Sequence, residues 1–154
     1  MKLRFVLITS LLAFTGATAS LRAQAPAAQS PSHEDSELGK KMSAMGKAFK
    51  KLRSQINDAS KNKDSAKLVA TMKENAEAAL KLVPEKTADL PAAEQAKFKA
   101  DFAKKMKSLI ADFSRLEGSL KAGDNAAAAK QLEAIGNLQK EGHKEFRKKK
   151  PEKK

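Results

Sequence analysis

The sequence predicts an all-α protein, an antiparallel up-down-up-down four-helix bundle. Ala, Lys, Leu and Glu dominate its 154 residues, which include only seven Gly, five Pro, no Trp and no Tyr. This composition favours helices, and Val, a strand former, occurs only three times. Apolar residues also recur at steps of three and four between the helix breakers, which is the period of an amphipathic helix. The length is that of one domain.

The first 25 residues predict a secretory signal peptide. Lys2 and Arg4 precede an apolar run that ends at Phe14, and small residues in Ala-x-Ala patterns follow. The run is too short to span a bilayer core of about 30 Å, so we expect cleavage and no membrane anchor in the mature protein. The short apolar run favours a bacterial periplasmic location. Residues 26–35, rich in Pro, Ser and Ala, predict a flexible linker.

The four-helix bundle is predicted for residues 36–149. Two prolines, Pro84 and Pro91, bound its central connection, and each half contains one further break. The first break is rich in Asn, Asp and Ser, and the second is Gly123-Asp124-Asn125, a helix C-cap followed by an N-cap. Short connections favour antiparallel neighbours. The predicted helices span residues 36–60, 64–83, 92–122 and 124–149, and a basic tail occupies 150–154.

The first three helices each carry one heptad-like apolar stripe that predicts a shared core. In the first helix the stripe is Leu38, Met42, Met45, Phe49, Leu52, Ile56 and Ala59. In the second it is Val69, Met72, Ala76, Ala79 and Val83, and in the third it is Phe98, Phe102, Met106, Leu109, Phe113, Leu116 and Leu120.

The fourth helix departs from this pattern. Its stripe begins normally with Ala128, Leu132 and Ile135, and then continues through Gly136, Gln139, Gly142 and His143 before Phe146. His143 lies about 20° from Leu132 around the helix axis, so the imidazole is expected to face the core. The inner face loses bulk where the other helices keep it, although each Gly costs roughly 1 kcal/mol relative to Ala. The pattern predicts a space that a flat apolar molecule could fill.

Met42 and His143 are expected at the same height in this space. The first helix starts and the fourth helix ends at the same end of such a bundle, and each residue lies roughly 9 Å from that end. Phe102 and Met106 of the third helix are expected near the same level. A thioether and an imidazole facing each other can ligate haem iron axially, and the absence of Cys would make that haem non-covalent. Taken alone, a Met in a stripe is core filler and a lone His is a core or edge residue.

Three passages resemble the cytochrome b562 family of four-helix bundles. They are LGKKMSAMGKAFKKL in the first helix, DFAKKMKSLIADF in the third and HKEFR at the end of the fourth. The resemblance covers residues 38–147 and implies a periplasmic protein with one non-covalent haem b per chain. It implies that Met42 and His143 are the axial ligands and that Phe102 and Met106 line the haem pocket.

The resemblance also assigns three further cofactor-binding residues. Arg147 matches the basic residue that follows the ligand His, and Gln139 stands where family members often carry Arg one turn before it. The change at Gln139 puts contacts to the haem propionates in doubt. Met45, one turn after Met42, is a rival axial ligand whose height matches His143 less well.

The chain is strongly basic, unlike many members of the family. Its formal net charge of +13 becomes +10 when Lys2, Arg4 and Arg22 are removed with the signal peptide. This surplus favours an acidic redox partner. Much of it lies at the C-terminal end of the chain, in Lys144, Arg147, Lys148, Lys149, Lys150, Lys153 and Lys154. We interpret this end as a solvated terminus more readily than as a specific nucleic-acid site. We expect a monomer.

Enzyme function is not expected, since no nucleotide-binding, serine-hydrolase or zinc-protease motif occurs. The group His33-Glu34-Asp35 is interpreted as a surface turn of the linker. Together these observations predict a periplasmic carrier of single electrons. Two alternatives are a haem-free, chaperone-like bundle whose basic surface binds acidic partners, and a lysine-rich protein that binds nucleic acid or an anionic polymer.

Overall fold

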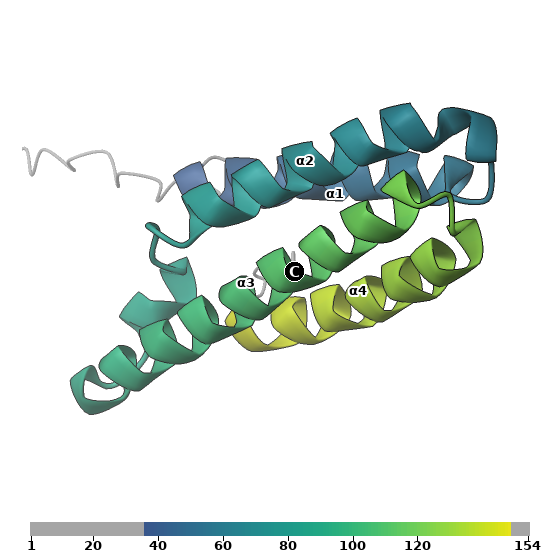
Figure 1. Cartoon of the computed structure of the whole chain (residues 1–154). Helices are drawn as coiled ribbons and strands as arrows, with labels where there is room; N and C mark the ends of the chain where they lie inside the picture. The colour runs from purple at the N-terminus through teal and green to yellow at the C-terminus, as the bar shows by residue number, and fades with distance from the viewer. Residues whose placement is uncertain (1–35, 149–154) are drawn as a thin grey trace, which may run out of the picture. The chain divides into compact units, whose positions relative to one another are not determined.

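Four long helices make up most of the part of the chain that the computed structural model describes, residues 36–148. They are α1 (Glu37–Gln55), α2 (Asn62–Ala79), α3 (Ala92–Lys121) and α4 (Asn125–Phe146), as Figure 1 shows. Two 3-10 helices lie in the connections, η1 (Ala59–Lys61) before α2 and η2 (Glu85–Asp89) between α2 and α3. The predicted signal peptide, linker and basic tail lie outside the described residues.

Where a helix end agrees with the sequence prediction, a side-chain cap or a glycine cap defines it. The Ser36 hydroxyl accepts a hydrogen bond of 3.1 Å from the Gly39 amide at the start of α1. At the α3–α4 turn Gly123 has a φ of 75°, and the Asp124 amide donates to the Ser119 carbonyl at 2.9 Å. These are the features of a Schellman motif, so the predicted C-cap at Gly123 is confirmed.

Helices α1, α2 and α4 end earlier than predicted, α4 at Phe146 instead of 149, and two predicted core residues in the first two are therefore wrong. α1 ends at Gln55, and Asp58 instead caps η1 by accepting from the Ser60 amide at 3.0 Å. Ala59 is exposed as a result. α2 ends at Ala79, and Val83 is 55% exposed. Val83 precedes a proline, and that position disfavours helical backbone angles.

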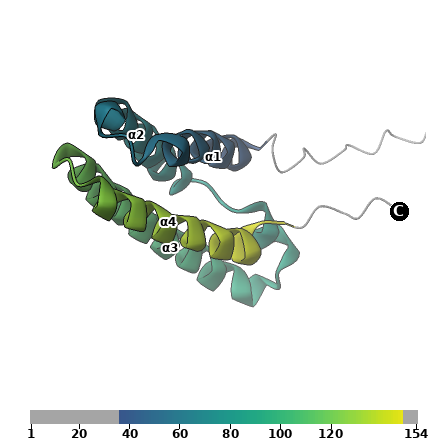
Figure 2. The same ribbon diagram turned by 90° about the vertical axis from the view of Figure 1, so that its right-hand side faces the viewer.

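The four helices form the predicted bundle. α1 packs against α2, α2 against α3 and α3 against α4, with consecutive helices antiparallel (Figures 1 and 2). α1 and α4 pack against each other far less closely than these pairs do. The core contains most of the predicted stripes: Leu38, Met45, Leu52, Ile56, Val69, Met72, Ala76, Ala79, Phe102, Met106, Phe113, Leu116, Leu120, Ala128, Leu132, Ile135 and Phe146 are buried. Among residues 36–148 no helix is long and apolar enough to cross a membrane.

Candidate functional site

A cavity lies beside the loosely packed pair α1 and α4. Its volume is about 470 Å³, within the range of about 300–1,000 Å³ typical of small-molecule sites. α1, α3 and α4 supply nearly all of its walls, and it opens to solvent. Most of the lining is apolar: Leu38, Met42, Met45, Phe49, Met72, Pro84, Phe102, Met106, Leu109, Phe113, Ile135, Leu138 and Phe146.

Every site residue predicted from the sequence lines this one cavity. Met42, Met45, Phe102, Met106, Gln139, His143 and Arg147 come from three helices and from the residue that follows α4. Met42 and His143 lie near opposite ends of the bundle sequence, and both line this cavity. The structure also brings Met72 to the cavity, so all four methionines of the described residues line it. Methionine is a flexible apolar side chain that adapts to the shape of a bound group.

The two predicted ligands, Met42 and His143, both line the cavity near the same end of the bundle, with Met42 somewhat farther from that end than His143. Met42 comes five residues after the start of α1, which is about 7.5 Å along the axis. His143 comes three residues before the end of α4, or about 4.5 Å from it. Met42 is half-buried and His143 is exposed, whereas the rival Met45 is buried. His143 therefore borders the cavity from a solvent-exposed position and is not buried in the core as its stripe predicted.

The glycines near the cavity have two different roles. A Cβ added to Gly46 of α1 or Gly142 of α4 would meet no atom within 4 Å, and both residues line the cavity. They leave room for a bound group to approach the helix backbone closely. A Cβ on Gly136 would instead lie 3.2 Å from Cζ of Phe49. The predicted space at Gly136 is thus already filled by an aromatic ring, and this residue allows α1 and α4 to approach each other.

The helix that carries His143 is held mainly by α3 and η2. The ring of Phe146 packs on those of Phe98 and Phe102, with centroids 5.1 and 5.4 Å away. The ammonium group of Lys86, in η2, donates to the Glu145 carbonyl at 2.5 Å and so satisfies one of the free carbonyls at the end of α4. Sequence reasoning missed this role of η2, because nothing in the local sequence shows that the central connection reaches the end of α4.

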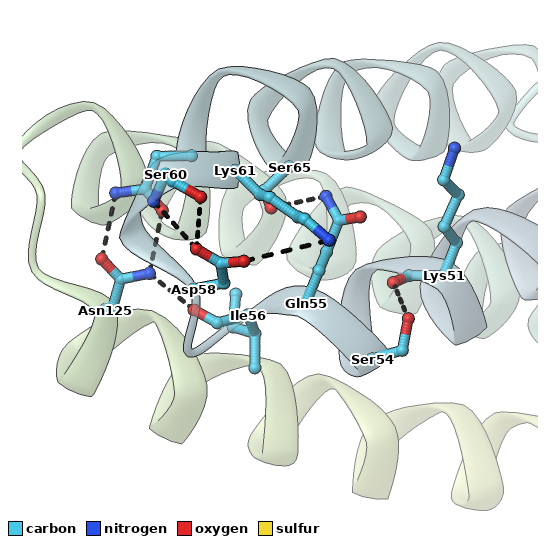
Figure 3. Close-up of polar contacts among 10 residues, drawn as sticks. Lys51, Ser54, Gln55, Ile56, Asp58, Ser60, Lys61, Ser65 and Asn125 are labelled. Atoms are coloured by element: carbon cyan, nitrogen blue, oxygen red, sulfur yellow. Dashed lines mark hydrogen bonds and ion pairs between the residues drawn. The ribbon is translucent and has the colours of Figure 1, made fainter.

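A polar cluster joins α1, α2 and α4 at the opposite end of the bundle (Figure 3). The Asn125 amide group donates to the Ile56 carbonyl at 2.6 Å, and the Asn125 and Asn62 side chains exchange hydrogen bonds of 2.8 and 3.0 Å. The Ser60 hydroxyl donates to Asp58 at 2.6 Å, and this bond holds the pKa of Asp58 below its usual value. The cluster joins the helices at the end that lies farthest from His143, and the α1 and α4 ribbons diverge away from it (Figure 2).

Among residues 36–148, the charged residues that line the cavity are all basic. They are Lys47 and Lys50 of α1, Lys105 of α3, and Arg147, and no carboxylate of this part of the chain lines it. Within the described residues there is also no group of three or more His, Cys, Asp or Glu that could hold a metal ion. The cavity thus offers Met sulfur and His nitrogen, which are soft or borderline donors. They suit a metal whose other ligands belong to the bound group itself.

Comparison with known proteins identifies the family. A family model described as cytochrome b562 matches residues 37–147, which include all four helices and every residue of the predicted site. No curated protein and no solved structure matches the chain. Because the family model covers most of the chain and extends from the start of α1 to the residue after α4, this protein belongs to the cytochrome b562 family.

Proposed function

We propose that the protein is a periplasmic carrier of single electrons that binds one b-type haem non-covalently between α1 and α4. Membership of the cytochrome b562 family supports the cofactor class and the electron-carrier role. The observation that carries the residue assignment is that Met42 and His143 line the same apolar cavity. The signal-peptide pattern of residues 1–25 supports the periplasmic location.

The residues present fit a haem group. The cavity is large, mostly apolar and open at one edge, and Gly46 and Gly142 leave it unobstructed beside both helices. Haem supplies a reversible one-electron couple. The Met42 sulfur and a His143 ring nitrogen would hold its iron, and this pair of donors would raise the reduction potential. The imidazole donates only when its ligating nitrogen is unprotonated.

The protein's contribution to electron transfer is to hold both donors in place. The buried side chains of Leu38 and Met45 hold α1 against the core, and the ring contacts of Phe146 hold the last turn of α4. Because α1 is packed on α2 and α4 on α3, the two donors keep nearly the same geometry in both oxidation states. The reorganisation energy of electron transfer therefore stays small. The buried faces of Phe102 and Met106 exclude water from the inner wall of the cavity. The exposed position of His143 leaves an edge from which an electron can leave.

A titration with hemin tests the proposal. The mature chain should give a saturable one-to-one change in the Soret band, and His143→Ala and Met42→Ala should each alter the resulting spectrum. His33→Ala is the matched control, because the chain has only two histidines and His33 belongs to the predicted linker. Met45→Leu should leave the ligand spectrum unchanged.

Two results would contradict the proposal. Failure to saturate at one hemin per chain would favour the haem-free bundle that binds acidic partners through its basic surface. A spectrum altered by Met45→Leu but not by Met42→Ala would move the sulfur ligand to Met45.

A further inference from the structure

We infer that the outer surface of α1, beside the mouth of the cavity, docks an acidic protein. This inference rests on the proposed function, since the docked protein would be the one that exchanges the electron. The surface is defined by Lys40, Lys47 and Lys50 and is called the α1 lysine face below.

α1 carries the highest net positive charge of the four helices, ahead of α3, whose seven basic and four acidic residues give +3. Its 19 residues include six that are basic and a single acidic residue, Glu37, in the first turn. α4, across the cavity mouth, carries three Lys and three Glu and is balanced. α2 is balanced in the same way, with three basic and three acidic residues. α1 therefore has a net charge of +5 beside the cavity.

The α1 lysine face points outward next to the opening. Lys40 and Lys47 are about 20° apart around the helix axis and Lys50 lies about 60° from Lys47, so all three share one side of α1. All three are exposed, and Lys47 and Lys50 also line the cavity. Lys40 forms an ion pair of 3.3 Å with Glu37, whereas Lys47 and Lys50 form none with any residue in the described part of the chain.

Neither the fold nor the proposed cofactor accounts for these lysines. Exposed lysines without partners contribute almost nothing to folding stability. The other two cations of the cavity lining, Lys105 and Arg147, already have interactions, and that of Lys105 is with Glu145 at 3.4 Å. The two propionates of one haem could neutralise at most two of the four lining cations. A positive surface therefore remains at the edge where an electron would leave.

Such a surface selects a partner by its charge. A cluster of like charges beside an opening raises the rate of encounter with oppositely charged proteins by about 10–10³-fold. Complementary charges at the rim act mainly on the association rate and on specificity. An acidic protein that docks on the α1 lysine face would approach the cavity mouth directly, and like-charged proteins would be repelled from it.

The test uses poly-L-glutamate as the acidic probe and the full mature chain, without added hemin. Binding is measured by titration calorimetry at low and at physiological ionic strength. The double variant Lys47→Glu, Lys50→Glu reverses two charges of the α1 lysine face. The matched control, Lys63→Glu, Lys99→Glu, changes the net charge equally at exposed lysines of α2 and α3 that do not line the cavity. Far-UV circular dichroism verifies that both variants keep the helical fold.

The inference predicts about tenfold weaker binding for the α1 variant and less than threefold for the control. Equal losses in the two variants would overturn it, because binding would then depend on net charge alone. Loss of binding only when the chain is cut after Lys148 would overturn it too, since the tail would be the site. Tighter binding of duplex DNA than of polyglutamate, abolished by the α1 variant, would make the face a nucleic-acid site instead. Because no hemin is present, failure here leaves the hemin titration unaffected, and failure of that titration leaves this result standing.

Discussion

Gly136→Ala probes the contact between α4 and the Phe49 ring of α1. Two opposing effects on the free energy of unfolding follow from the structure. Replacing a helical glycine by alanine stabilises a helix by about 1 kcal/mol. The new Cβ, however, would lie 3.2 Å from Cζ of Phe49, which is closer than ordinary van der Waals contact. The Phe49 ring must shift by a few tenths of an ångström, and overpacking of this kind costs about 1–3 kcal/mol.

The ring is half-buried and borders the cavity, so it has room to tilt and the cost should fall at the lower end of that range. The gain and the cost then nearly cancel, and we expect Gly136→Ala to be as stable as the parent or less stable by up to about 0.5 kcal/mol. Gly118→Ala is the matched control. A Cβ there meets no atom within 4 Å, and Gly118 is a helical residue that does not line the cavity. The control should gain about 0.5–1 kcal/mol.

The assay is urea unfolding of the hemin-free chain followed by far-UV circular dichroism, with both variants and the parent compared at equal m-values. The control should be more stable than Gly136→Ala by about 1 kcal/mol. If the two variants are equally stabilised, Phe49 does not press on Gly136, and the account of how α1 and α4 are spaced is wrong.

Three further predictions follow from the same structure. Gly142→Ala should stabilise the hemin-free chain by about 0.5–1 kcal/mol, because the added Cβ meets open space. The same variant should weaken hemin binding, because that open space belongs to the cavity. Equal hemin affinity would show that the group does not lie beside Gly142. Asn125→Ala should lower the free energy of unfolding by about 2 kcal/mol, since it removes the hydrogen bonds to Ile56 and Asn62, whereas the exposed Asn137→Ala should not; both are measured by urea unfolding. The hydrogen bond from Lys121 holds the pKa of Glu117 below its usual value, so this pair stabilises the fold above about pH 4.3 and loses its contribution as the pH falls through the lowered pKa. In acid titrations monitored by circular dichroism, Glu117→Gln should therefore flatten the stability loss below that pH, and an unchanged profile would contradict the assignment.

The bundle could be predicted from the sequence because its determinants are local. The Gly123 turn, the prolines around the central connection and the apolar stripes each act within one helix or one connection. The errors at Ala59 and Val83 occur at helix ends, where the apolar period continues in the sequence but capping by Asp58 or a following proline ends the helix.

The candidate site could be predicted in part, because heights along antiparallel helices follow from sequence position. That geometry is enough to place Met42 and His143 at the same end of the bundle, where both line one cavity. It does not reveal that Phe49 fills the space at Gly136, or that Lys86 of η2 reaches the end of α4. Both contacts join segments far apart in the chain, and no local pattern encodes them.

Shared ligation of one iron by Met42 and His143 is the central claim, and X-ray absorption of the hemin-loaded chain at the iron edge tests it most directly. The account predicts one sulfur in the first coordination shell and, beyond the four ring nitrogens, one further nitrogen. The sulfur should disappear in Met42→Ala and the extra nitrogen in His143→Ala. A first shell without sulfur in the parent protein, or one that both variants leave unchanged, would contradict it.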